Sequence, residues 1–175
     1  EGAYPVAFLS AVKELARDGV LDPGNFRIVF AGYIHPDARR EIEGSSLGDT
    51  LELAGTVSHK DAVRIMLRSD MLLLFDPGPG AECYVHGKLY EYIATGNWIL
   101  GLMPRGAARR LLESSGHGIS VEANDAAGVR RALAAAVERK DRPETAPGFD
   151  LSFYERRRLA SRLAGCINEV CGGRR

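Results

Sequence analysis

Apolar positions along the chain recur with two alternating periods. Val6, Leu9, Val12 and Leu15 follow helical spacing, whereas 26–31 and 71–75 are short apolar runs typical of strands buried on both faces. Further helices are expected over 37–43, 58–67, 88–95, 107–113 and from 124 to about 139, and further strands over 51–54, 98–102 and 118–121. This alternation predicts an α/β fold with a mostly parallel sheet covered by helices on both sides.

The end of the chain departs from this alternation. Residues 141–150 contain two prolines and one glycine, which is typical of a linker. Ser152 and Glu155 match a capping box, and it predicts a terminal helix with Leu159, Leu163 and Ile167 on one face. The pattern therefore divides the chain into a domain over 1–140, a linker over 141–150 and a C-terminal helix over 151–175.

Composition narrows the classes of protein that fit. The chain has 175 residues, of which 45% are hydrophobic, and its 23 basic and 23 acidic side chains cancel. A neutral chain has no global field for nucleic acid, so we expect no nucleic-acid partner. No apolar run approaches the roughly 18 residues that span a bilayer. The odd number of cysteines, at Cys83, Cys166 and Cys171, favours a reducing, cytoplasmic setting without a metal site.

Glycines lie where several predicted strands end. Gly32 follows the first strand and Gly55 the second, and a loop rich in glycine and proline runs over 76–87 after the third. Ligands of open parallel sheets bind outside the carboxyl ends of the strands, where glycine lets backbone approach a ligand. The alternative is that each glycine only forms a tight turn, and the recurrence of glycine at several strand ends favours a ligand site.

The helix that follows this long loop carries the strongest candidate chemistry. Its expected start at His86 and Gly87 offers free N–H groups to a phosphate, and Lys88 adds a positive charge. Glu91 lies three residues further on the same face and has the chemistry to accept hydrogen bonds from ribose hydroxyls. The alternative reading is a surface Lys–Glu ion pair worth a few tenths of a kcal/mol.

Five segments in order resemble a known family. The stretch from Gly87 to Gly96, followed by Trp98-Ile99-Leu100, resembles the donor-site helix of GT-B glycosyltransferases of the retaining group 1 family. Residues 51–61 are similar to that family's strand-Gly-x-Val segment, and 68–75 to its Ser-Asp segment with an apolar strand. Residues 116–118 and the helix over 152–170 follow in the family's order. The resemblance covers nearly the whole chain.

The resemblance implies a Rossmann-like donor domain, the C-terminal half of a two-domain GT-B enzyme. It implies that Glu91 holds the ribose, that Gly55, Thr56 and Val57 offer backbone to the base, and that 79–87 faces the sugar and diphosphate. Lys88 and Gly87 are inferred to contact phosphate, and Gly32 lies on the same rim. The donor would be a UDP or GDP sugar, with no further cofactor. Catalytic residues are not assigned.

The sequence departs from the family pattern at three points. The family often carries a glutamate eight positions before Glu91, where this chain has Cys83, and Glu82 lies one step out of register. Trp98 stands where the family usually has proline. The family's first strand would precede Pro5, and the chain begins without Met, so we expect a piece of a longer protein.

These expectations lead to one leading function and two alternatives. The leading reading is a glycosyltransferase of the hexosyl-transferring type in polysaccharide biosynthesis, inactive as this piece alone, whose C-terminal helix packs toward an N-terminal acceptor domain. The alternatives are a nucleotide-sugar epimerase of GT-B-like fold and a non-catalytic binding or interaction module. Arg156, Arg157 and Arg158 allow a peripheral membrane contact, and a solvated helix face is the simpler reading.

Overall fold

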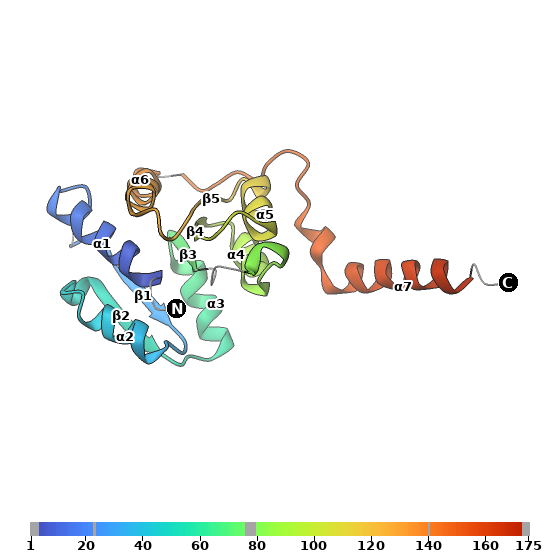
Figure 1. Ribbon diagram of the computed structural model, residues 1–175, viewed down its shortest axis with the longest axis horizontal. Helices are drawn as coiled ribbons and strands as arrows, with labels where there is room; N and C mark the ends of the chain where they lie inside the picture. The colour runs from blue at the N-terminus through green and yellow to red at the C-terminus, as the bar shows by residue number, and fades with distance from the viewer. Residues whose placement is uncertain (1–3, 23, 76–79, 140, 173–175) are drawn as a thin grey trace.

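The computed structural model describes residues 4–22, 24–75, 80–139 and 141–172, and it shows strands and helices alternating along the chain (Figure 1). The strands are β1 (Ile28–Ala31), β2 (Leu51–Gly55), β3 (Met71–Phe75), β4 (Trp98–Leu102) and β5 (Gly118–Val121). The helices are α1 (Tyr4–Arg17), α2 (Pro36–Glu43), α3 (His59–Arg68), α4 (Gly87–Thr95), α5 (Ala107–Ser115), α6 (Ala126–Val137) and α7 (Arg156–Gly172), with short 3-10 turns η1 (Gly48–Thr50), η2 (Ala81–Cys83) and η3 (Leu151–Tyr154).

All pairs of hydrogen-bonded strands are parallel, which confirms the predicted α/β class. β1 pairs with β2, and β4 lies between β3 and β5. The structure differs from the expectation of one sheet, because in the described chain β1 and β3 are not hydrogen-bonded to each other and the strands form two sheets. Apolar runs identify strands, but they carry no information on which strands pair.

Helices cover the strands on both faces. One apolar cluster joins α1 and α6 to the strands of both sheets and includes Phe8, Leu15, Ile28, Leu102 and Val129. A second cluster lies on the other face of the three-stranded sheet, where Leu89 of α4 and Leu112 of α5 pack on Ile99. The alternating side chains of β3 and β4 divide between the two clusters, so this sheet is buried on both sides.

Local capping explains where most of the helices begin and end. The Ser58 side chain accepts a hydrogen bond from the Asp61 amide at 3.2 Å, as the sequence predicts for the start of α3. The Asp125 side chain caps α6 in the same way, and Gly96 ends α4 in the left-handed conformation with φ of 71°.

The expected capping box at Ser152 is wrong. The Ser152 amide and hydroxyl both donate to Asp150, at 2.9 and 2.6 Å, and the chain forms η3 instead. The terminal helix begins only at Arg156. Asp150 at the start of this turn competes for Ser152, because aspartate readily accepts bonds from amides two residues on.

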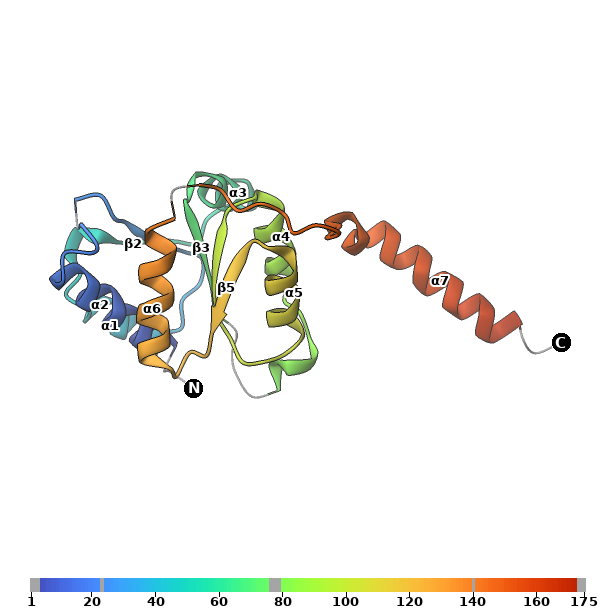
Figure 2. The same ribbon diagram turned by 90° about the horizontal axis from the view of Figure 1, so that it is seen from above.

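The segment expected as a linker runs along the domain before α7 leaves it. The Trp98 indole Nε1 donates to the Asp141 carbonyl at 2.6 Å, and the Ala146 amide donates to the Ser115 carbonyl at 3.0 Å. Beyond η3, α7 projects away from the strands (Figure 2). Every residue of α7 is exposed, and the predicted packing of this helix on an N-terminal domain stays a prediction.

Candidate functional site

The carboxyl ends of the parallel strands form one rim of the molecule. The strand arrows point toward the lower side of Figure 2, where η2 also lies. β1 runs into Gly32, β2 ends at Gly55, and β4 runs into the turn before α5. Part of the predicted ligand loop, residues 76–79, lies outside the described residues, so the expectation for Pro79 has no structural account.

A pocket of about 580 Å³ lies at the ends of β1 and β2. Its lining includes Gly32, Gly55 and Thr56, three of the residues that the sequence predicts for a donor site. The Gly32 amide donates to the Gly55 carbonyl at 2.7 Å, which holds the two turns together. Their φ angles are 115° and 65°, and a Cβ at either position would meet open space. Glycine is therefore required by backbone conformation here, and it also leaves main chain accessible.

Helix α2 supplies pocket residues that sequence reasoning missed. Arg39 and Arg40 line the pocket together with Tyr33, whose side chain is 83% exposed. Arg39 Nε lies 2.7 Å from Glu43 Oε1, and Arg40 pairs with Asp37, so each guanidinium already has a carboxylate partner. The available signal was the pair of arginines one turn into the helix that follows a strand ending in glycine. The other residues of that helix are mostly polar and indicate a solvent-exposed helix.

Val57 and His35 do not line the pocket. Val57 is half-buried and is not part of the pocket lining. His35 Nδ1 accepts a hydrogen bond from the Asp37 amide at 3.3 Å and caps α2. Of the predicted segment Gly55-Thr56-Val57, only its first two residues therefore reach the pocket.

Among the described residues, no side chain caps the start of α4. His86 occupies the N-cap position but makes no side-chain cap bond, whereas α3 and α6 are capped by Ser58 and Asp125. Gly87 is the first helical residue, and a Cβ there would meet no atom within 4 Å. Uncapped N–H groups and the positive end of the helix dipole favour a negative group at such a position.

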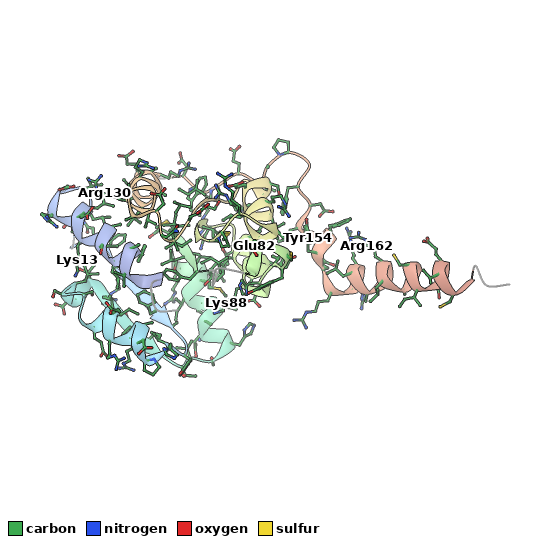
Figure 3. All side chains as sticks on the ribbon, viewed as in Figure 1. Lys13, Glu82, Lys88, Arg130, Tyr154 and Arg162 are labelled. Carbon is green, nitrogen blue, oxygen red and sulfur yellow. The ribbon has the colours of Figure 1, made fainter. Side chains whose placement is uncertain are left out.

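Lys88 in the first turn of α4 and Glu91 one turn into the helix are both exposed to solvent (Figure 3 labels Lys88). Within the described chain, neither makes an ion pair or a side-chain hydrogen bond, so the alternative of a surface Lys–Glu pair is absent from the structure. Leu89 and Ile93, at 0% and 3% exposed, anchor the opposite face of the helix. Burial raises the pKa of the neighbouring Tyr92, and the Glu91 charge adds to that shift.

Glu82 is held at the same rim by its main chain. A Cβ at Gly106 would lie 2.6 Å from Glu82 Cα, so the backbone of η2 packs directly on the turn before α5. The Glu82 carboxylate accepts a hydrogen bond from the Gly80 amide at 3.0 Å and is exposed. Cys83 beside it is an exposed free thiol. The side chain of Glu82 thus already has a local role in the turn.

The predicted residues fall into two groups along one rim. Gly32, Gly55 and Thr56 line the pocket, while Gly87, Lys88 and Glu91 form the uncapped start of α4. Among the described residues, no cluster of three or more His, Cys, Asp or Glu side chains is arranged to hold a metal ion. Within that same part of the chain, no helix is both long and apolar enough to cross a bilayer.

Comparisons with known proteins identify the fold. No family model matches the chain, and no curated protein matches it. Among solved structures, UDP-GlcNAc 2-epimerase from Methanocaldococcus jannaschii superposes with a TM-score of 0.58 at 13% identity, over 94% of this chain and 42% of the other. The fold is that of a GT-B-like Rossmann domain, as expected.

Two further structures share this fold and contain ligands. The same epimerase in complex with UDP-GlcNAc and UDP gives a TM-score of 0.55 at 14% identity, over 91% of this chain and 41% of the other. Anabaena Alr3699/HepE in complex with UDP gives 0.55 at 15% identity, over 94% and 47%. The chain spans less than half the length of each, and membership of the group 1 glycosyltransferases is not confirmed by these likenesses.

Proposed function

We propose that this chain binds a nucleotide-diphosphate sugar along its carboxyl rim and is the donor-binding half of a GT-B-like enzyme. The observation that carries the proposal is the start of α4, where no side chain caps the helix and the exposed Lys88 and Glu91 make no ion pair or side-chain hydrogen bond in the described chain. The UDP and UDP-GlcNAc complexes of proteins with this fold support it.

The proposed arrangement assigns one part of the donor to each group of residues. The α4 start and Lys88 hold the diphosphate, because both offer positive charge. Glu91, one turn into the helix, accepts hydrogen bonds from the ribose hydroxyls. The main chain of Gly55 and Thr56 contacts the base at the pocket, and Glu82 lies toward the sugar.

We propose glycosyl transfer as the reaction. When the bond between the anomeric carbon and the diphosphate oxygen breaks, negative charge develops on the leaving diphosphate. We propose that the first-turn N–H groups of α4 and the Lys88 ammonium stabilise that charge, since such preorganised electrostatic terms are often the largest in catalysis. The acceptor and the residues that complete the reaction would come from the facing domain, so this chain alone should bind a donor and transfer nothing.

Titration calorimetry with UDP, GDP and ADP tests the binding site. We expect one nucleotide to bind, and Glu91→Ala to weaken it by about 1–3 kcal/mol, the cost of losing hydrogen bonds to a charged group. Glu138→Ala, an exposed carboxylate beyond α6, is the matched control and should leave affinity unchanged. Absence of binding at millimolar nucleotide, or equal affinities for the two variants, would overturn the proposal.

Epimerisation of the sugar is the second candidate, and the two Methanocaldococcus jannaschii structures favour it. The two reactions differ in their need for an acceptor. In a longer protein that contains this chain, transfer predicts that UDP release from a UDP sugar depends on an added acceptor. Epimerisation predicts a changed sugar without any acceptor, detectable by NMR of the sugar ring protons.

We also propose that α7 packs on the facing domain of such a protein. Leu159, Leu163, Ile167 and Val170 form an apolar stripe along it, between 42% and 75% exposed. Arg158 is already paired with Asp150 at 3.3 Å, and Arg162 stacks on Phe153 at 4.1 Å. Leu163→Glu should therefore destabilise a two-domain protein and leave this chain alone unaffected in thermal unfolding.

A further inference from the structure

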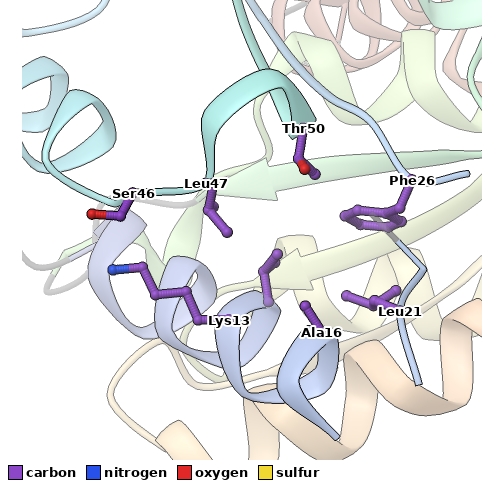
Figure 4. A pocket seen from close by; sticks show the side chains of 8 residues that line it. Lys13, Ala16, Leu21, Phe26, Ser46, Leu47 and Thr50 are labelled. Atoms are coloured by element: carbon purple, nitrogen blue, oxygen red, sulfur yellow. The ribbon is translucent and has the colours of Figure 1, made fainter. Parts of the chain in front are cut away.

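A second pocket lies at the opposite end of β1 and β2 from the candidate donor site. It has a volume of about 230 Å³ and is formed by α1, the segment that leads into β1 and the turn before β2 (Figure 4). Phe26 precedes β1 and Thr50 precedes β2, so this pocket is at the amino ends of the strands. The proposed donor function leaves it unused.

The floor of this pocket is apolar. Val12 and Leu21 are 1% and 3% exposed, and Ala16, Phe26 and Leu47 line the walls half-buried. The volume lies just below the range of about 300–1,000 Å³ for drug-sized ligands, so the space suits a smaller molecule. An apolar lining of this kind favours an aryl ring or a short alkyl chain.

One cation and two hydroxyl groups edge the pocket. Lys13 extends along one side toward Ser46, and Thr50 lies across from it (Figure 4). Within the described residues, none of these three side chains makes a hydrogen bond or an ion pair. Ser46 also has a φ of 57°, a left-handed conformation that is uncommon for residues other than glycine.

The charges around the pocket favour an anion. Arg17, one turn beyond Lys13 on α1, has no carboxylate partner in the described chain either. The acidic side chains of that helix turn, Glu14 and Asp18, are instead paired with Arg130 of α6 at 3.5 and 2.6 Å. Asp49 is next to Thr50 in sequence but does not line the pocket.

We propose that this pocket binds a small amphipathic monocarboxylate. The apolar body occupies the space between Val12, Leu21 and Phe26, and the carboxylate pairs with the Lys13 ammonium on the side of the pocket opposite Thr50. A single lysine matches the single charge of a carboxylate, and the stem of Lys13 packs along the ligand body.

Ligand-detected NMR and calorimetry with phenylacetate and hexanoate test this site. We expect saturable binding in the millimolar range, with amide shifts at Leu47 and Thr50. The neutral amides of the same two acids should bind at least tenfold more weakly, because they lose the ion pair. Lack of saturation at 20 millimolar, which is about twenty times a Kd of 1 millimolar, would overturn the proposal. Equal binding of acid and amide would also overturn it.

Two variants test separately the contribution of the Lys13 charge and that of the apolar cavity. Lys13→Met keeps the apolar stem and should abolish the preference for acid over amide, whereas Lys60→Met, an exposed lysine on α3, should not. Ala16→Leu fills the pocket and should abolish binding of both compounds while circular dichroism stays native. A preference that survives Lys13→Met would show that the cation is not the determinant. Because the probes carry no nucleotide, failure here leaves the donor-site proposal standing, and the reverse also holds.

Discussion

The two sheets are built from strands of similar length, yet they are buried to very different degrees. In β4, Ile99, Leu100 and Leu102 are at most 1% exposed, whereas β2 has no buried residue. β4 has a hydrogen-bonded strand on each side and helices on both faces, while β2 has one strand neighbour among the described residues. β2 also carries the charged Glu52 where β4 is apolar throughout, so the difference in burial follows both from the residues of each strand and from its neighbours in the sheet.

The largest contrast should come from truncating a leucine in each sheet. Leu100→Ala in β4 is expected to lower the free energy of unfolding by about 3–4 kcal/mol, because it leaves a cavity in the best-packed layer. Leu53→Ala in β2, where the side chain is half-buried, should cost about 1–2 kcal/mol. Urea denaturation measures both, and equal losses would contradict the comparison.

Replacing a glycine by alanine in each sheet distinguishes destabilisation by steric overlap from destabilisation by an unfavourable backbone conformation. A Cβ at Gly118 in β5 would lie 2.3 Å from the Ile99 carbonyl oxygen, so Gly118→Ala should destabilise by about 2–3 kcal/mol. At Gly55, the last residue of β2, an added Cβ would meet open space. The cost of Gly55→Ala, about 1 kcal/mol, therefore comes only from the φ of 65°. Thermal unfolding of the two variants should rank them in this order, and the reverse order would refute it.

A smaller effect is expected for the ion pairs that link the helices over the two sheets. Arg130 of α6 reaches Glu14 and Asp18 of α1, and all three side chains are partly exposed. Arg130→Ala should therefore cost only about 0.5–1 kcal/mol, and the loss should shrink in 1 M salt. Arg131→Ala, whose contact at 4.0 Å is to Asp125 at the start of the same helix, serves as control. A salt-independent loss would point to packing instead.

The smallest expected effect is a pH dependence of stability that comes from a histidine beside the three-stranded sheet. His117, 5% exposed before β5, has a pKa lowered by burial. Because the folded chain then holds fewer protons than the unfolded chain, stability is full above about pH 6.5 and falls as the pH drops below it. Thermal unfolding at pH 7.5 and 5.5 should show a smaller loss for His117→Gln than for the native chain. His59→Gln, an exposed control, should keep the native difference.

Most of the fold followed from the pattern of apolar residues. The helices and strands predicted over 51–54, 88–95 and 98–102 appear with nearly the same ends, because capping and glycine signals are local. The division into two sheets did not follow, since pairing depends on contacts between distant segments. The start of β1 at Ile28 rather than Phe26, and of α7 at Arg156, also depended on hydrogen bonds that the pattern does not show.

The candidate site was predicted in part. Gly32 and Gly55 were identified because glycine at a strand end has a physical reason to be there. Arg39 and Arg40 were missed because their place in the pocket depends on how α2 turns back over the ends of β1 and β2. The Lys13 pocket gave no signal either, because residues 12–50 come together there only after folding.

The split between β1 and β3 leaves the described chain with four open strand edges where one continuous sheet would have two. An open edge exposes unpaired N–H and C=O groups and acts as a template for another strand. β1 and β3 contribute to one apolar cluster. A strand that pairs with either edge would satisfy these groups. Such a strand, supplied in the same chain or as a peptide, would suppress aggregation as well as add stability.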